Sequence, residues 1–435
     1  MIPNSKTIAK NVGIFGGAQV FSVLAALIRT KFAAVFIGTA GVGLSAVYNT
    51  VVTFYSNVAG LGLSFSGVKH LSEIYAHDDK ETFSEEVARL RTLGLLGATG
   101  GFLLSLVFAP VLSCFYFEGW SQTLPFALLS FFIAVNIFAG VELAVLKSMQ
   151  KTRSLAMSAI WLAVVSVVFS VPFYLLCGVK GVIWAVMISG TAGALITIWL
   201  GHRAIGLGIA SPFVNMQKQS IAELLRHSRP VIVLGIAFLL GGVVASGSEM
   251  IIQGYLSAMA SLSVLGLYKA GYQLSITYTG MIFTAVSNDF YPRLSAVNNK
   301  INERNILISR QIKVLLFFTV PLVALFVILV PYILPILFDN TFNPVSRMVQ
   351  IASLSIIVKS VTMPLNFLPL SLGKSLDYLC LEGAFWILLV PLVILGFAYG
   401  GLDGTGIAIL LCHVIELVYV ILFCRIRYGY RFVTQ

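Results

Sequence analysis

Four basic residues lie inside long apolar segments of this sequence, where a charge is costly. They are Arg29, Lys31, Lys269 and Lys359. A charged side chain at the centre of a bilayer costs at least about 2.5–3.5 kcal/mol on insertion scales, so a charge kept at that depth indicates a function. Lysine and arginine bind phosphate groups readily. These residues therefore predict a binding surface for an anionic substrate group, with phosphate as the favoured chemistry.

Arg29 and Lys31 cannot both contribute to one such surface. They are two residues apart, which separates them by about 200° around a helix. At least one of them is expected to extend toward the membrane surface or to contact another helix. The sequence leaves open which of the two faces a cavity.

Further polar side chains lie at helical spacing near these cations. Lys269, Tyr272 and Gln273 follow an i, i+3, i+4 pattern, which places them on one face of a helix. Asn49 lies in the second apolar segment, and the internal repeat described below aligns it with Tyr272. Asn49, Tyr272 and Gln273 are therefore further candidates for substrate binding.

Three acidic residues in apolar segments are candidates for coupling to an ion gradient. They are Glu142, Glu249 and Glu416. A carboxylate inside the membrane can take up H⁺ or Na⁺, which would couple a transport cycle to that ion. The alternative, which the sequence leaves open, is that each acid lies at a helix end or pairs with a basic residue.

No motif indicates a cofactor, a metal site or catalysis. The five cysteines include no C-x-x-C pair, and neither a Walker motif nor an HExxH sequence is present. The net charge of +11 would suggest nucleic acid in a soluble protein, but the basic residues lie mainly in short connecting loops. We therefore expect that the protein binds no cofactor and no nucleic acid, and that it is not an enzyme.

The elements that position these residues must be membrane-spanning helices. The chain is 58% hydrophobic and 10% charged, whereas soluble domains carry about 25% charged residues. Segments long enough to span a bilayer are helical, because each must satisfy its own backbone. About twelve lie near residues 11–37, 42–68, 90–115, 124–147, 156–178, 182–205, 229–256, 264–290, 312–338, 346–371, 377–398 and 404–424.

The distribution of lysine and arginine predicts the orientation. Most of the 28 basic residues, Arg89 and Arg91 among them, fall in the loops on one side or near the termini. The opposite connections, which include 38–41, 179–181 and 399–403, are short and hold only Lys180. Both termini are therefore predicted to be cytoplasmic. The cytoplasmic segment 70–91 is predicted to be one amphipathic connecting helix.

The sequence repeats itself at a constant offset of 223 residues. Gly43 aligns with Gly266, Lys151 aligns with Lys374, and GVKG at 178–181 aligns with GLDG at 401–404. The matches fall at the same predicted place in each half. They predict two parallel six-helix bundles, residues 1–213 and 214–435, with a cavity between them.

Two stretches resemble a known family. TKFAAVFIGTAGVGLSAVYNTV (30–51) with GLGLSFSGVKHLSEIYAHDD (60–79) resembles the N-terminal signature of polysaccharide-transporter flippases. VLGLYKAGYQLS (264–275) with YPRLSAV (291–297) resembles the matching signature of the second half. The flippases that these stretches resemble are the Wzx-type translocases of O-antigen and enterobacterial common antigen, in the multidrug/oligosaccharidyl-lipid/polysaccharide (MOP) superfamily.

The resemblance implies a function and a partner. A relative of these flippases would move an undecaprenyl-pyrophosphate-linked oligosaccharide from the cytoplasmic to the periplasmic leaflet of the bacterial inner membrane, for the assembly of O-antigen and lipopolysaccharide. Its two bundles would form a V that alternates between inward- and outward-open states. Basic residues on the first and eighth helices would meet the pyrophosphate, and here these are Arg29 or Lys31, and Lys269. Membrane lipids and other polysaccharide-assembly proteins would be further partners.

Two other functions fit the composition. An ion-coupled antiporter of drugs or cations from the same superfamily shares the twelve-span form, but its cavity should favour acidic and aromatic residues. A membrane polysaccharide polymerase or ligase would need a sizeable outer loop for its chemistry, and each predicted outer connection is about ten residues or fewer. The basic excess favours the flippase.

Overall fold

The computed structural model describes residues 5–77, 80–205, 221–277 and 300–433, with residues 280, 283, 286, 290, 291 and 293–297. The secondary structure of this described part is helical and contains no strand. This confirms the predicted all-α class. Contacts divide the chain into two compact units, Met1–Met250 and Ile251–Gln435, called here the N-terminal and C-terminal units.

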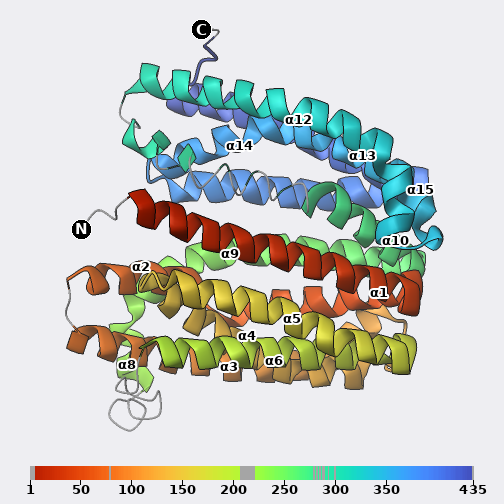
Figure 1. Cartoon of the computed structure of the whole chain (residues 1–435), viewed down its shortest axis with the longest axis horizontal. Helices are drawn as coiled ribbons and strands as arrows, with labels where there is room; N and C mark the ends of the chain where they lie inside the picture. Colours follow the sequence, from red (N-terminus) through yellow and green to blue (C-terminus); the bar gives the residue numbers. More distant parts are fainter. Residues whose placement is uncertain are drawn as a thin grey trace. The chain divides into compact units, whose positions relative to one another are not determined.

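Long helices make up most of the N-terminal unit, and short turns join them from α1 to α6 where the structure describes the chain (Figure 1). Its elements are α1 (Ser5–Ala59), α2 (Leu63–Ala76), α3 (Lys80–Tyr116), α4 (Thr123–Ser148), α5 (Thr152–Cys177), the 3₁₀ turn η1 (Gly178–Gly181), α6 (Val182–Ile205), α8 (Ile221–His227) and the first part of α9 (Arg229–Met259). Helix α4 packs against both α3 and α6, and α5 packs against α1 and α6.

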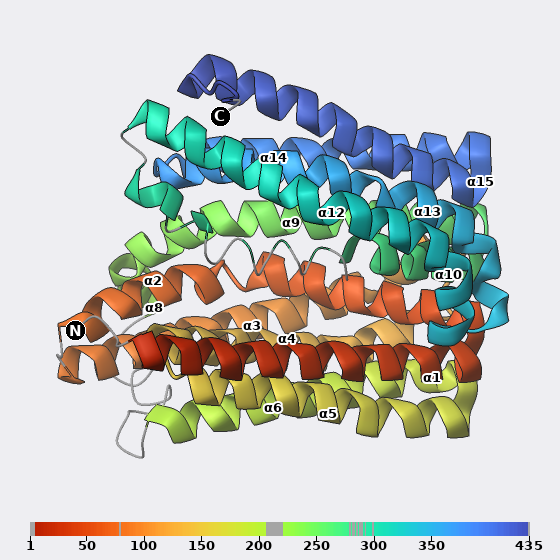
Figure 2. The ribbon, with the colours of Figure 1, turned by 45° about the horizontal axis from the view of Figure 1, so that its top comes forward.

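The C-terminal unit continues from the end of α9. Its further elements are α10 (Leu262–Tyr272), the π-helical turn η2 (Gln273–Thr277), α12 (Ile301–Leu337), the 3₁₀ turn η3 (Asn340–Val345), α13 (Ser346–Ser353), α14 (Ser355–Ser371) and α15 (Ser375–Tyr428). Helices α12 and α14 contact one another and lie side by side in both views (Figures 1 and 2).

The described helices account for most of the predicted spans. Eight are long and apolar enough to cross a membrane, and three of these, of 43, 52 and 54 residues, are long enough to cross twice. The predicted span 264–290 lies partly outside the described residues. The chain is thus a multi-pass membrane protein.

Each of the three longest helical stretches turns at a glycine, which lies in a predicted outer connection (Gly38, Gly401) or one residue before it (Gly178). Gly38, Gly178 and Gly401 have φ values of 62°, 56° and 56°. This left-handed region carries no steric penalty for glycine, because it has no Cβ. The chain reverses at these residues with almost no loop.

The backbone itself repeats at the predicted offset of 223. Gly178 and Gly401 share nearly one conformation, with ψ values of −137° and −141°. The turns that precede α5 and α15 also match, because Gln150 and Gly373 are both left-handed and Lys151 and Lys374 have ψ values of 64° and 63°. The predicted boundary of the halves, between residues 213 and 214, lies outside the described residues and stays a prediction.

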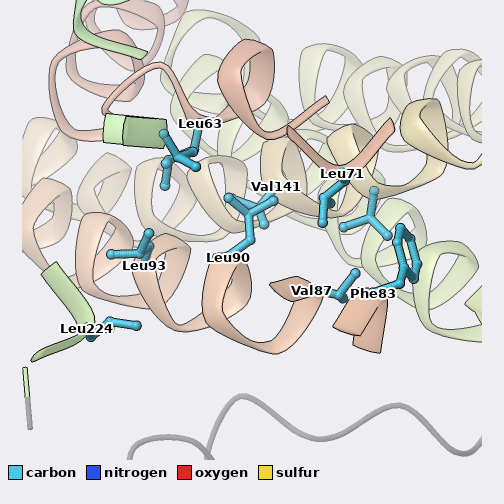
Figure 3. Close-up of a cluster of buried hydrophobic side chains, with 10 residues drawn as sticks. Leu63, Leu71, Phe83, Val87, Leu90, Leu93, Val141 and Leu224 are labelled. Atoms are coloured by element: carbon cyan, nitrogen blue, oxygen red, sulfur yellow. The ribbon is translucent and has the colours of Figure 1, made fainter. Parts of the chain in front are cut away.

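The prediction of one connecting helix over 70–91 is wrong. The segment comprises the end of α2 and the start of α3, with Asp78 and Asp79 outside the described residues. The predicted apolar side is nevertheless buried, because Leu71, Phe83 and Val87 belong to a core cluster that α4 and α9 complete with Val141, Val145 and Val231 (Figure 3). Burial of both segments against α4 makes two helix ends more stable here than one free connecting helix.

The turn between α1 and α2 makes a backbone contact that predicts one variant. Gly62 has φ +65°, and a Cβ on it would overlap the carbonyl oxygen of Gly235 in α9. Gly62→Ala should destabilise the protein by about 1–3 kcal/mol, because it adds backbone strain to this clash. Gly100→Ala, in open space on α3, should be neutral or gain up to about 1 kcal/mol. Thermal unfolding of both purified variants in detergent checks this, and equal melting temperatures would contradict it.

Candidate functional site

A cavity of about 550 Å³ lies within the N-terminal unit. Helices α1, α4, α5 and α6 form its walls. Arg29 comes from the first part of α1, before the turn at Gly38, and Asn49 comes from the second part. The kink at Gly38 therefore brings these two predicted site residues to one cavity.

Hydroxyl and amide groups dominate the polar lining of this cavity. Its hydroxyl-bearing residues are Ser22, Ser158, Ser166, Ser170, Tyr174, Ser189 and Thr197. Asn136 donates to Ser56 Oγ at 3.1 Å, and Asn49 donates to the Ser45 carbonyl at 2.7 Å, which leaves both amide oxygens as acceptors. Among the described lining residues, Arg29 is the one that carries a charge. The cavity combines one guanidinium with many neutral hydrogen-bonding groups.

A second cavity, of about 230 Å³, lies within the C-terminal unit. Lys359 of α14 lines it together with Glu382, His413 and Glu416 of α15. The amide of Asn366 donates to Glu382 Oε1 at 3.4 Å and to Glu416 Oε1 at 3.2 Å. One amide therefore joins two carboxylates, the buried one of Glu416 and the half-buried one of Glu382, and a single lysine shares their cavity.

The two cavities occupy the same place in the internal repeat. Asn49 and Asn136 line the first, and Tyr272 and Lys359, at the offset of 223, line the second. The same holds for the pairs Ala139/Thr362, Gly140/Met363, Leu143/Asn366, Ala159/Glu382, Leu162/Phe385, Ala163/Trp386 and Gly190/His413. Nine lining positions are thus shared while their chemistry differs, because at these nine positions the ionisable residues (Tyr272, Lys359, Glu382 and His413) all belong to the second cavity.

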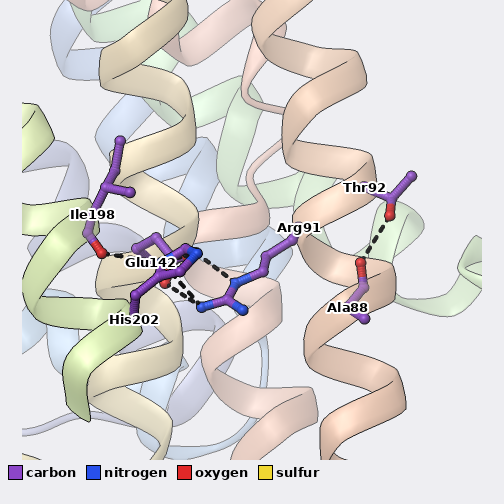
Figure 4. A network of polar contacts seen from close by, with 6 residues as sticks. All are labelled: Ala88, Arg91, Thr92, Glu142, Ile198 and His202. Atoms are coloured by element: carbon purple, nitrogen blue, oxygen red, sulfur yellow. Dashed lines mark hydrogen bonds and ion pairs between the residues drawn. The ribbon is translucent and has the colours of Figure 1, made fainter. Parts of the chain in front are cut away.

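Glu142 lines neither cavity and forms a buried ion pair instead (Figure 4). Its carboxylate accepts from Arg91 Nε at 2.6 Å and from an Arg91 terminal nitrogen at 2.9 Å, and both side chains are almost fully buried. His202 of α6 lies 3.7 Å from the same carboxylate. This fork-to-fork geometry joins α3, α4 and α6. Of the two interpretations left open for Glu142, it favours charge pairing.

Some of the other predicted site residues line one of the two cavities, and the rest line neither. Arg29 and Asn49 line the first cavity, and Tyr272, Lys359 and Glu416 line the second. Lys31, Gln273 and Glu249 are not among the residues that line the described cavities. Lys269 is also absent from these linings, and its ammonium lies 5.7 Å from the Tyr272 ring centroid.

Sequence reasoning missed two residues that line the cavities and one partner in the buried ion pair. A signal existed for the first of these. Asn136 stands at the offset from Lys359, so the repeat alone would have found it. Asn366 is an amide in an apolar segment, and no charge drew attention to it. Arg91 was taken for a loop residue and is in fact 1% exposed within α3, because this helix begins at Lys80.

A family model described as a polysaccharide biosynthesis protein matches residues 8–298. This match covers well over half of the chain. The chain belongs to this family of polysaccharide biosynthesis proteins. The comparison with curated protein sequences gave no match.

Solved structures show the fold of this polysaccharide biosynthesis family member. An inward-facing multidrug-resistance MATE transporter of the MOP superfamily is 12% identical, with 94% of each chain covered and a TM-score of 0.78. The lipid II flippase MurJ, in an inward closed conformation, is 15% identical over 94% of this chain and 87% of its own, with a TM-score of 0.71. These likenesses confirm the predicted MOP fold.

A third solved structure has the same fold and a different pocket. It is a MOP superfamily transporter from Pyrococcus furiosus, 12% identical over 97% of this chain and 96% of its own, with a TM-score of 0.67. A reversed polarity of its binding pocket suggests a different function for that protein.

The buried ion pair predicts a double-variant result. At the offset of 223, Arg91 and Glu142 correspond to Val314 and Leu365, so the fold accepts apolar residues at both places. Arg91→Val alone or Glu142→Leu alone should cost about 3–5 kcal/mol, because each leaves a buried charge without its partner. Arg91→Val with Glu142→Leu should recover most of that loss. Melting temperatures in detergent measure this, and additive losses in the double variant would contradict it.

Proposed function

We propose that this protein is a flippase for an undecaprenyl-pyrophosphate-linked oligosaccharide. It would carry this lipid from the cytoplasmic to the periplasmic leaflet of the bacterial inner membrane by alternating access, for the assembly of surface polysaccharide such as O-antigen. Family membership and a fold shared with a lipid II flippase support this proposal. The observation that carries it is the chemistry of the cavity in the N-terminal unit.

The cavity that contains Arg29 suits a cargo with sugar and phosphate parts. A guanidinium binds phosphate oxygens through paired hydrogen bonds. The surrounding serine, threonine and asparagine groups can exchange hydrogen bonds with sugar hydroxyls without a cost in charge. A volume of about 550 Å³ lies in the usual range for small-molecule sites, and one or two sugar units are a reasonable fit.

Lys31 and Lys269 are assigned to the same cargo. Both stay candidates to contact the pyrophosphate, as the family resemblance implies, and Gln273 continues the polar face that Lys269 begins. Because Lys31 is on the opposite side of its helix from Arg29, the two residues would act on different sides of the cargo or at different steps.

The cavity in the C-terminal unit suits ion coupling. Two carboxylates, Glu382 and Glu416, share it with one lysine, so one negative charge remains to be balanced when all three are ionised. A proton or a sodium ion on this carboxylate pair would supply that balance. Glu142 is already paired with Arg91. Glu416 is therefore a stronger coupling candidate than Glu142, and Glu249 stays a candidate.

An ion-coupled antiporter of drugs or cations is the second candidate. The carboxylates of the C-terminal cavity favour it, and MATE transporters share the fold. Arg29 opposes it, because a cavity lined by one cation repels a cationic drug. Drug-stimulated ion flux in proteoliposomes, without binding of lipid-linked sugar, would favour the antiporter over the flippase.

One prediction from the proposed function tests the basic residues in a strain that lacks its own flippase. Arg29→Gln should lower surface polysaccharide about tenfold or more, because it removes a charge-assisted contact, and Arg29→Lys should restore part of it. Lys31→Ala and Lys269→Ala should also fail to complement. The measurements are surface polysaccharide, accumulated lipid-linked oligosaccharide and protein level.

The matched control for these variants is Arg153→Gln, at an exposed position at the start of α5. It should complement fully. Full complementation by Arg29→Gln, Lys31→Ala and Lys269→Ala at normal protein level would refute the role of the basic residues.

Another prediction from the proposed function concerns the coupling ion. In proteoliposomes, Glu416→Gln should make transport independent of imposed proton and sodium gradients, because the remaining Glu382 carboxylate is balanced by Lys359. Glu303→Gln, on the exposed start of α12, should keep the dependence of the unaltered protein. A gradient dependence unchanged in Glu416→Gln would remove this residue from the coupling step.

A further inference from the structure

A third cavity lies where the C-terminal tail meets the ends of the helices of the C-terminal unit. Its volume is about 510 Å³. The apolar part of its lining comes from α12, α14 and α15 and consists of Ile312, Val361, Leu365 and Ile421. Arg425, Tyr430, Arg431 and Phe432 complete it. An apolar wall therefore ends at two guanidinium groups, one on α15 and one on the tail.

The tail is held in place along the first turns of α12. Asn305 donates to the carbonyl of Gly429 at 3.3 Å, and the backbone N–H of Val433 donates to Ser309 Oγ at 3.0 Å. The ammonium of Lys313 lies 5.7 Å from the Phe432 ring centroid. These contacts fix Arg431 and Phe432 at the rim of the cavity.

The internal repeat shows what this cavity lacks. The positions of Arg91, Glu142 and His202 in the N-terminal unit correspond to Val314, Leu365 and Arg425 at the offset of 223. In the first copy a buried ion pair joins these helices. In the second copy the carboxylate is replaced by Leu365, and both Leu365 and Arg425 line an open cavity. Arg425 thus stands where the first copy has His202 beside a carboxylate, and this copy has Leu365 in place of that carboxylate.

Within the part of the chain that the structure describes, neither Arg425 nor Arg431 forms an ion pair. Both side chains are exposed. Apolar side chains beside them are exposed as well, since Ile426 is 83% exposed and Phe432 is 53% exposed. Exposed apolar groups next to free cations at the ends of spanning helices are typical of the membrane interface.

We propose that this cavity binds an anionic phospholipid. The phosphate of the headgroup would contact Arg425 and Arg431, and an acyl chain would lie along Val361 and Ile421, the half-buried apolar residues of the lining. Charge complementarity selects an anionic headgroup, and the apolar wall selects a lipid over a soluble phosphate. The site is separate from the two cavities proposed for cargo and ion, so it does not depend on the flippase function.

Lipid binding to the purified full-length protein tests this proposal. Delipidated protein in detergent is titrated with phosphatidylglycerol and with phosphatidylcholine of the same acyl chains, and bound lipid is counted by native mass spectrometry. We expect a preference for phosphatidylglycerol. Arg425→Gln with Arg431→Gln should weaken that binding about 25-fold, at about fivefold for each basic residue.

Two further variants separate this site from general charge effects. Arg310→Gln with Arg427→Gln removes the same charge from residues outside the cavity lining and should bind phosphatidylglycerol as the unaltered protein does. Val361→Phe keeps every charge but narrows the apolar wall, and it should weaken binding of the lipid. Size-exclusion profiles and melting temperatures establish that each variant is folded.

Four outcomes would overturn the proposal, and the first three concern phosphatidylglycerol itself. They are equal binding of the two phospholipids, equal loss in the two double-arginine variants, and displacement of phosphatidylglycerol by inorganic phosphate at millimolar concentration. Binding of a polyprenyl pyrophosphate in its place, with no binding of phosphatidylglycerol, would assign the cavity to cargo and would also refute it.

Discussion

The low dielectric of the membrane interior is the constraint on which the other features of this protein depend. An ionised side chain in that medium must have a partner of opposite charge or a polar cavity. Five of the acids and bases inside these helices follow this rule, in two ways. Glu142 and Arg91 neutralise one another among α3, α4 and α6. Arg29, Lys359 and Glu416 instead line cavities, and a charge kept at a cavity wall stays available for a ligand.

The fold could be predicted to a large extent because its signals are local. Hydropathy marks the spans, and the offset of 223 is visible in short stretches such as those around Gly178 and Gly401. The reversal at Gly38 was also placed in the right connection. These features depend on residues close in sequence, and sequence patterns report them directly.

The candidate site was only partly predictable because its partners are distant in sequence. Glu142 and Arg91 are 51 positions apart, and whether an acid meets a base depends on helix rotation, which the sequence does not report to within a residue. The same uncertainty applied to Arg29 and Lys31. Only the folded α1, with its kink, places Arg29 at a cavity that Lys31 does not line. Ionisable residues attract attention in a sequence, whereas amides such as Asn136 and Asn366 do not.

The two repeat-related cavities suggest how this architecture arose. Two copies of one six-helix unit at a constant offset are the expected product of a gene duplication. After gene duplication, positions held by Ala159 and Gly190 in one copy were free to become Glu382 and His413 in the other. One copy has a hydroxyl-rich pocket with the single charge of Arg29, while the pocket of the other copy holds Lys359, Glu382 and Glu416. The backbone turns are the same in both copies, so the side chains of each pocket can differ while the helices keep their arrangement within each copy.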